Sequence, residues 1–301
     1  MKLIQAIEFA FELKARESRR NSIVTYSSFV SIFTNYLKET KKANYKLEDF
    51  TKKEAIQYLD YVLVKRNVSA LTRNNYLKAM KVLFYVLIDR DYIKTNPFSG
   101  IKKLKIERKR RTVFSRSECG IICNYLKGRD NGLLLAISLC YYCALRPSEI
   151  RRLKVQDIDL TNGFITLDGT ETKNKNLARI TMPNHLVEFC KEIGIKKYPA
   201  NFHIMGYQLR PALEPCGFNT IRRTHLKVLR ELEEYRLLTD IENKSFYSWK
   251  DTAARDMIEE GVNAAALMKH FRHASLETTQ KYLESFGVKN DRIRELRSKI
   301  F

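Results

Sequence analysis

The chain has 301 residues, a length that favours two domains over one. It carries 55 lysine and arginine residues against 34 aspartate and glutamate residues, a formal net charge of +21, and 44% of its residues are hydrophobic. These values argue against a disordered chain. The positive charge indicates a polyanionic partner, most commonly nucleic acid, and makes a metabolic enzyme for small neutral substrates less favoured.

No segment approaches the roughly 18–20 apolar residues that a membrane-spanning helix needs, and the N-terminus lacks the pattern of a signal peptide. The six cysteines are too few for a disulfide framework in a chain of this length. Cys140 and Cys143 form a C-x-x-C pair within the apolar run 133–145, which indicates buried structural thiols rather than a metal or redox site. We therefore expect a cytoplasmic protein without a membrane anchor, a metal ion or a cofactor.

The first hundred residues have the pattern of a helical domain. Apolar side chains recur at helical spacing in four segments, and Thr51 with Glu54 forms a capping-box pattern at the start of the third. The four predicted helices span 3–13, 26–37, 51–63 and 69–91. The Asn96-Pro97 step then ends the helical pattern.

A short basic segment follows, in which seven of ten residues are basic and one is acidic. Its basic residues are Lys102, Lys103, Lys105, Arg108, Lys109, Arg110 and Arg111. A solvated linker explains such a run, and so does a strap that lies along DNA phosphates. The position of the segment between two folded halves favours the strap.

The second half combines helices with a small sheet. Residues 164–167 and 179–182 have the pattern of two strands of a hairpin, with residues 173–176 at its tip. The predicted helices span 117–126, 132–145, 185–193, 220–238, 251–260, 264–271 and 276–286. The expected fold is thus mainly α, with a small antiparallel sheet in the second domain.

Two motifs in this half stand out from the helical pattern. Arg146 stands where an apolar helix breaks at Pro147, a junction that can hold a guanidinium rigidly, and its planar fork suits phosphate oxygens. Nearer the C-terminus, His273 and Tyr282 are nine residues apart, with a helix start expected between them at Ser275. The arginine alone is a weak signal, because a surface arginine before a proline is common, and the C-terminal motif adds much more.

Together, Arg146, the hairpin lysines, His273 and Tyr282 resemble the tyrosine recombinase, or phage integrase, family. The resemblance covers nearly the whole chain. It implies a helical core-binding, SAM-like domain over residues 1–101, a linker over 102–111, and an α+β catalytic domain over 112–301. It also implies a site-specific recombinase that cleaves one DNA strand at a time through a 3′-phosphotyrosine and rejoins strands without a metal.

The resemblance assigns roles to single residues. Tyr282 matches the nucleophile, and Arg146 and His273 match the groups that contact the scissile phosphate. Glu149 matches the acid of the same box, a residue that supports the fold or orients the arginine rather than taking part in catalysis. These roles suit a reaction that needs a nucleophile and cations around a developing phosphorane.

In this family the general acid is a lysine on a β-hairpin. Lys173 and Lys175 both lie near the hairpin tip, and the distance of Lys173 from Gly163 favours Lys173, with Lys175 as the alternative. A lysine suits the role because its pKa falls when it is placed among cations in a partly desolvated site.

The second family box, H-x-x-R, is altered here. Tyr247 takes the histidine position and Lys250 the arginine position, replacements that resemble those in integrases of Bacteroides-type mobile elements. A lysine keeps the charge and loses the bidentate fork. The change leaves open a catalytically impaired, integrase-like protein that only binds specific DNA. Trp249, inside this box, is expected to pack in the core.

The implied partners are double-stranded DNA and further copies of the chain, as a tetramer on paired DNA sites. On the predicted helix 69–91, Asn74, Asn75 and Lys78 are candidates for base contacts, although a solvated helix face explains them equally well.

Overall fold

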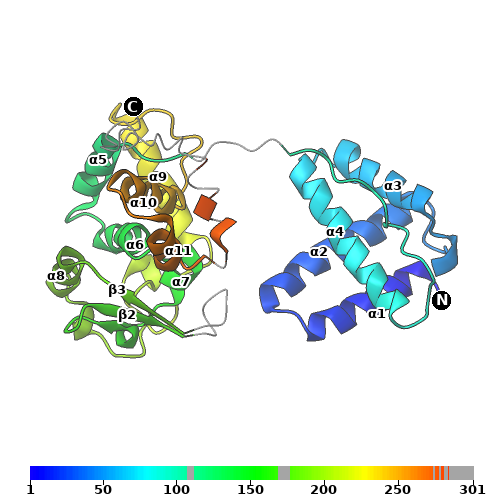
Figure 1. Cartoon of the computed structure of the whole chain (residues 1–301), viewed down its shortest axis with the longest axis horizontal. Helices are drawn as coiled ribbons and strands as arrows, with labels where there is room; N and C mark the ends of the chain where they lie inside the picture. Colours follow the sequence, from blue (N-terminus) through cyan, green and yellow to red (C-terminus); the bar gives the residue numbers. More distant parts are fainter. Residues whose placement is uncertain (107–111, 169–176, 274, 278, 281–283, 285–301) are drawn as a thin grey trace, which may run out of the picture. The chain divides into compact units, whose positions relative to one another are not determined.

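The computed structural model describes residues 1–106, 112–168, 177–273, 275–277, 279, 280 and 284. The chain divides into two compact units, residues 1–108 and 109–301, drawn in Figure 1. The predicted linker 102–111 spans the division between them, and its contact with DNA stays a prediction. None of the helices in these ranges is long and apolar enough to cross a membrane.

The first unit contains the four helices that the sequence predicts. They are α1 (Leu3–Arg16), α2 (Arg20–Glu39), α3 (Lys52–Asp60) and α4 (Ala70–Ile88). Thr51 and Glu54 form the predicted capping box of α3, and the Ser69 hydroxyl accepts a hydrogen bond from the Thr72 N–H at the start of α4. These caps satisfy N–H groups that a helix leaves unpaired at its first turn.

Aromatic rings fill the core between these helices. Phe33 of α2 meets Tyr58 of α3 edge-to-face with 4.9 Å between ring centroids, and Phe84 of α4 meets Phe98 at 5.3 Å. All four side chains are buried. In Figure 1, α4 crosses α1 and α2, against which it packs. This packing fixes the orientation of α4 within the unit.

The beginning of the basic segment packs on α4 rather than leaving the unit directly. The Asn74 side chain donates to the Leu104 carbonyl and accepts from the Leu104 N–H, both at 2.9 Å, while Arg73 donates to the Lys102 carbonyl at 3.1 Å. Asn74 is only 5% exposed. The structure thus gives Asn74 a role in holding the backbone, and a base contact no longer fits it.

Two other candidates on the same helix face solvent. Asn75 and Lys78 are exposed, and because they are three residues apart they share one side of a helix with 3.6 residues per turn. The base contacts predicted for α4 therefore rest on these two residues.

The second unit holds seven helices within the described residues and a three-stranded antiparallel sheet in the order β1-β2-β3. The helices are α5 (Arg116–Leu126), α6 (Asn131–Tyr142), α7 (Pro147–Arg152), α8 (Asn184–Glu192), α9 (Thr220–Glu234), α10 (Ser248–Glu259) and α11 (Ala264–Phe271). The strands are β1 (Ile158–Asp159), β2 (Phe164–Leu167) and β3 (Ala178–Thr181). The hairpin formed by β2 and β3 confirms the predicted strand pair, with Ile165 opposite Ile180.

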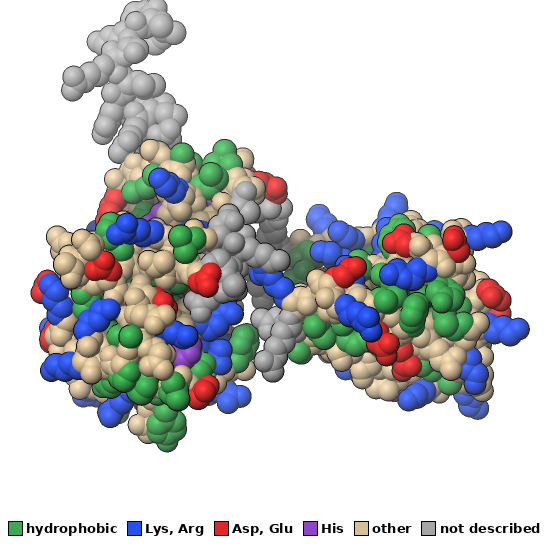
Figure 2. Space-filling model, turned by 90° about the horizontal axis from the view of Figure 1, so that it is seen from below, with side chains coloured by type: hydrophobic (Ala, Val, Ile, Leu, Met, Phe, Trp, Pro, Cys, Tyr) green, Lys and Arg blue, Asp and Glu red, His purple; other side chains and the backbone are tan. Residues whose placement is uncertain are grey.

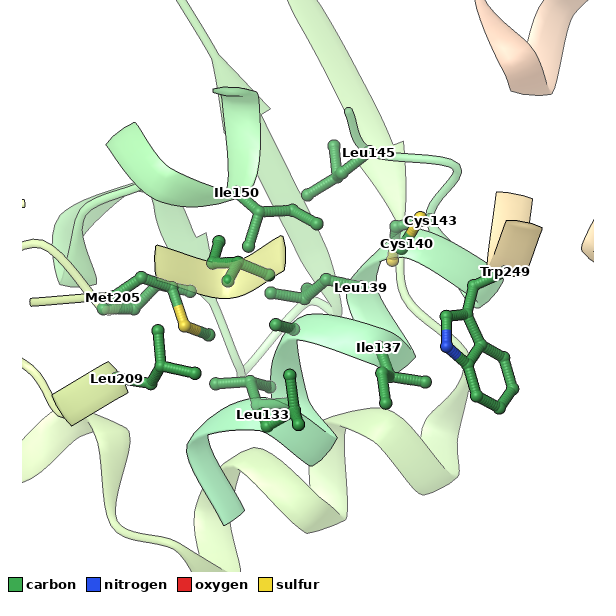
Figure 3. Close-up of a cluster of buried hydrophobic side chains, with 14 of the residues drawn as sticks. Leu133, Ile137, Leu139, Cys140, Cys143, Leu145, Ile150, Met205, Leu209 and Trp249 are labelled. Atoms are coloured by element: carbon green, nitrogen blue, oxygen red, sulfur yellow. The ribbon is translucent and has the colours of Figure 1, made fainter. Parts of the chain in front are cut away.

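Helix α6 lies at the centre of this unit and packs against α5, α7, α9 and α10. Figure 3 shows Leu133, Ile137 and Leu139 of α6 among side chains from α7 and the following segments. Cys140 and Cys143 are buried, and burial raises the pKa of each thiol to about 12, as expected for structural cysteines.

The only tryptophan of the chain belongs to this core, as predicted. The Trp249 indole N–H donates to His225 Nε2 at 2.9 Å, and the ring stacks on Phe114 with 4.5 Å between centroids. Burial lowers the pKa of His225 to about 4, which keeps its imidazole neutral and able to accept this hydrogen bond. The contact secures the start of α10, where the altered second box lies.

We expect Asn74→Ala to lower the free energy of unfolding by about 1–2 kcal/mol, because two hydrogen bonds to Leu104 are lost. The Leu104 amide should exchange with solvent faster, which hydrogen-exchange mass spectrometry measures. Asn75→Ala is the matched control and should change stability by less than about 0.5 kcal/mol, since Asn75 is exposed. Equal losses in the two variants would contradict the role of Asn74.

Candidate active site

The site is built on a turn that ends α6 earlier than predicted. The helix ends at Tyr142 rather than at 145, because Ala144 adopts a left-handed conformation with φ of 49°. The Leu145 N–H then donates back to the Leu139 carbonyl at 3.2 Å. This geometry, common after helix ends, turns the chain into α7 and places Arg146 immediately before it.

Glu149 joins two arginines beneath this turn. One carboxylate oxygen accepts from the Arg146 guanidinium at 2.8 Å, and the other accepts from the Arg146 backbone N–H at 2.8 Å and from the Arg272 guanidinium at 2.7 Å. Glu149 is 1% exposed, and the charge of its carboxylate is balanced by the two guanidinium groups, which are themselves largely buried. Of the two roles expected for Glu149, these contacts favour the orientation of Arg146, and they add Arg272 as a second partner.

Lys250 lies below the same turn. Its ammonium donates to the Ala144 carbonyl at 2.5 Å, and the residue is 1% exposed. Burial lowers the pKa of Lys250 to about 7, with further contributions from the positive charges of Arg146 and Arg272. Lys250, which takes the arginine position of the second box, therefore lies close to Arg146, but its ammonium binds a backbone carbonyl.

Arg272 ends α11 in a left-handed conformation with φ of 52°. Besides Glu149, its guanidinium donates to the Ala144 carbonyl at 3.1 Å, and its side chain is 13% exposed. Burial lowers the pKa of Arg272 from its usual value, although an arginine stays charged at neutral pH. The sequence prediction gave this residue no role; its place directly before His273 was the one available signal.

Small apolar side chains allow these segments to approach one another. Ala144 packs against Ala253 and Ala254 of α10 and against Leu267 and Phe271 of α11 in a buried cluster. Alanines on α10 let the turn come close enough for its carbonyl to meet Lys250. The polar groups that meet at this turn form what we call the Glu149 cluster: the Ala144 carbonyl with Arg146, Glu149, Lys250 and Arg272.

His273 follows the Glu149 cluster directly in the chain. Its Nδ1 shares a hydrogen bond with the hydroxyl of the buried Thr279 at 2.8 Å, a contact that orients the ring. Tyr247 precedes α10 and is 36% exposed, and its carbonyl accepts from the Lys250 N–H at 3.0 Å. Of the predicted catalytic residues, the structure thus brings Arg146, Lys250 and His273 together on three adjacent segments.

Several predicted site residues lie outside the described residues. They are Lys173, Lys175, Tyr282, Arg108, Lys109, Arg110 and Arg111. The described basic residues of the same segment, Lys102, Lys103 and Lys105, are exposed. Their contacts with DNA and the roles of the catalytic residues stay predictions.

The Glu149 cluster combines three basic side chains with one acidic one, and can stabilise an anion. Guanidinium groups held by a carboxylate keep their orientation when the anion arrives, which is the arrangement that stabilises a developing charge. Figure 2 shows that lysine and arginine side chains also spread over the visible face of both units. The arrangement suits a phosphodiester.

Comparison with known proteins gives matches to both units. Residues 113–287 match the model described as the phage integrase family, and residues 6–94 match the phage integrase N-terminal SAM-like domain. A tyrosine recombinase of Pseudothermotoga lettingae is 24% identical over 295 residues, which cover 94% of this chain and 96% of the relative. Tyrosine recombinase XerD of Rickettsia prowazekii is 26% identical over 286 residues, covering 90% and 88%.

Solved structures show the same fold. The Tn1549 transposon integrase in complex with a circular intermediate DNA aligns with a TM-score of 0.77 at 16% identity and covers 98% of both chains. A lambda integrase tetramer bound to a Holliday junction aligns with a TM-score of 0.74 at 17% identity, covering 97% of this chain and 80% of the other. These matches confirm the predicted fold class, a SAM-like helical domain with an α+β catalytic domain. Because the catalytic family model alone spans more than half of the chain, this protein belongs to the phage integrase family of tyrosine recombinases.

Proposed function

We propose that this protein is a site-specific DNA recombinase that cleaves and rejoins double-stranded DNA through a 3′-phosphotyrosine on Tyr282. The observation that supports this most directly is the Glu149 cluster, in which a buried carboxylate orients Arg146 beside the loop that carries His273. A protein that only binds DNA needs no such buried, preorganised cations, since surface lysines supply backbone affinity. Membership of a recombinase family agrees with this choice.

In the proposed cleavage step, the Tyr282 phenol loses its proton to solvent, its oxygen attacks the scissile phosphorus, and the bond from phosphorus to the 5′ oxygen breaks. Lys173 gives a proton to the departing 5′ oxygen, with Lys175 as the alternative donor. Arg146 and His273 donate hydrogen bonds to the non-bridging oxygens, where charge develops. Because the phosphotyrosine conserves the energy of the broken bond, the reverse attack by another 5′-hydroxyl rejoins the strands without a cofactor.

Both replaced residues of the altered second box have a part in the proposed reaction. Lys250 adds positive potential beneath the turn that carries Arg146, since its ammonium binds the Ala144 carbonyl. Tyr247, at the start of α10, donates a hydrogen bond to phosphate in the place of the family histidine. Its reference pKa of about 10 suits a donor and not a base at neutral pH.

Strand exchange between two DNA sites requires several active sites at once, and we propose a tetramer on paired sites. The lambda integrase tetramer on a Holliday junction supports this assembly for a chain of the same fold. Affinity comes chiefly from backbone contacts, including the basic segment 102–111, with Asn75 and Lys78 as candidates for base contacts. We place the protein on the cytoplasmic nucleoid, where such DNA is found.

The central test uses a nicked suicide substrate that carries the recombination site, identified from the DNA that flanks the gene. Wild-type protein should form a covalent adduct, seen as a slow band on a denaturing gel, and Tyr282→Phe should form none while binding the DNA with unchanged affinity. Tyr235→Phe is the matched control, because it removes an exposed tyrosine hydroxyl of the same unit that has no proposed role, and should leave adduct formation unchanged.

Specific binding by the wild type without any adduct would instead support the impaired, DNA-binding protein that the altered box suggests. An adduct that persists in Tyr282→Phe would assign the nucleophile to another residue, and mapping of the DNA-linked peptide would identify it.

DNA binding should take up protons at about pH 8. In the free protein Lys250 has a pKa of about 7, so it is mostly neutral there. A bound phosphate offsets the repulsion from Arg146 and Arg272, raises the pKa of Lys250 and draws a proton from the buffer. Binding enthalpies measured by calorimetry in buffers of different ionisation heat should therefore differ. Lys250→Met should reduce the uptake; an undiminished uptake in this variant contradicts the role of Lys250.

Affinity for DNA should depend steeply on salt, partly through the basic segment. Replacing Lys102, Lys103 and Lys105 by glutamine should reduce the slope of log K against log salt by up to about 2.7, since each phosphate contact contributes about 0.9. Fluorescence anisotropy with labelled duplex measures the slope. Lys14→Gln with Lys191→Gln is the control, because both lysines already pair with glutamates, and should change it little.

A further inference from the structure

We infer that Arg272 supplies the second guanidinium of the active site, in place of the arginine that the altered box lacks. The inference rests on the proposed function and names a residue that contacts the scissile phosphate in that reaction. It assigns Lys250 a positioning role, through the Ala144 carbonyl that Lys250 and Arg272 share.

The first argument is geometric. The two guanidinium groups bind opposite oxygens of one carboxylate, with Arg146 on one side of Glu149 at 2.8 Å and Arg272 on the other at 2.7 Å. Two forks fixed by the same buried acid can present donors to different oxygens of one phosphate. A single arginine fork with a buried ammonium offers fewer oriented donors.

The second argument concerns access. Lys250 is 1% exposed and its ammonium is bonded to backbone, so it cannot reach a phosphate unless the turn at Ala144 opens. The side chains of Arg146 and Arg272 are 22% and 13% exposed. Of the three cations in the Glu149 cluster, the two arginines are therefore the ones that a ligand can meet.

The third argument comes from the backbone and the remaining donors. Arg272 occupies a left-handed position after α11 that favours glycine, and a side chain there has a conformational cost. Its contacts with Glu149 and Ala144 offset this cost. The Nε of Arg272 is buried and has no hydrogen-bond partner within the described residues, so the guanidinium has more donors than the protein acceptors around it.

The test compares two suicide substrates, one with a normal scissile phosphate and one with a neutral methylphosphonate at that position. A cation that neutralises the phosphate is needed only on the first. Arg272→Gly should slow adduct formation roughly 10²–10³-fold on phosphate DNA, as expected for the loss of one transition-state donor, and less than tenfold on methylphosphonate DNA. A merely structural role predicts the same loss on both substrates and would overturn the inference.

Two further variants keep the test decisive if Arg272→Gly folds poorly. Arg272→Lys retains the charge without the fork, and should cleave phosphate DNA at least tenfold more slowly than wild type yet match it on methylphosphonate. Wild-type rates on both substrates would refute the inference. Arg255→Met is the matched control, because Arg255 is a half-buried arginine paired with Asp256 in the same unit, and its ratio of the two rates should equal that of wild type.

A rescue experiment tests the division of roles between positions 250 and 272. In the Arg272→Gly background, Lys250→Arg places a guanidinium where Ala144 and Glu149 have lost a donor, and should recover at least tenfold of the cleavage rate on phosphate DNA. No recovery would argue against the exchange of roles. If wild-type protein forms no adduct on either substrate, the proposed function fails. If wild-type protein forms the adduct and the Arg272 variants form it at the same rates, this inference fails and the proposed function stands.

Discussion

The candidate active site depends on a buried carboxylate. Glu149 receives donors from Arg146 on one oxygen and from Arg272 on the other, across 123 residues of sequence. An ion pair at a surface contributes little, whereas removing one partner from a buried pair costs about 3–5 kcal/mol because a charge is left uncompensated. Glu149 therefore links the catalytic geometry to folding, since the segments that it joins cannot separate without exposing or stranding a charge.

Backbone geometry makes this link possible. Ala144 and Arg272 both adopt left-handed conformations at helix ends, which turn the carbonyl of one and the side chain of the other toward the same point. The alanines of α10 remove the bulk that would keep the turn away. Small residues and left-handed residues at two helix ends thus bring a carbonyl, a carboxylate and three basic side chains within hydrogen-bonding distance.

The sequence predicted features that depend on near neighbours. The capping box at Thr51 was recognisable because both partners lie within one helical turn, and the amphipathic helices because their period is local. The strand β1 was missed because two residues carry no period. Asn74 looked like a surface residue because its partner, Leu104, lies thirty residues away.

The contacts of Lys250 and Arg272 could not be predicted for the same reason, because both side chains bind a carbonyl more than a hundred residues away in the sequence. Within the described part of the chain, the ammonium of Lys250 donates to the Ala144 carbonyl, and a lysine can lose its proton where acceptors are few. A guanidinium at that position would compete with Arg272 for this carbonyl and for Glu149. With Arg272 already in place, a lysine therefore fits position 250 with fewer competing donors than an arginine would.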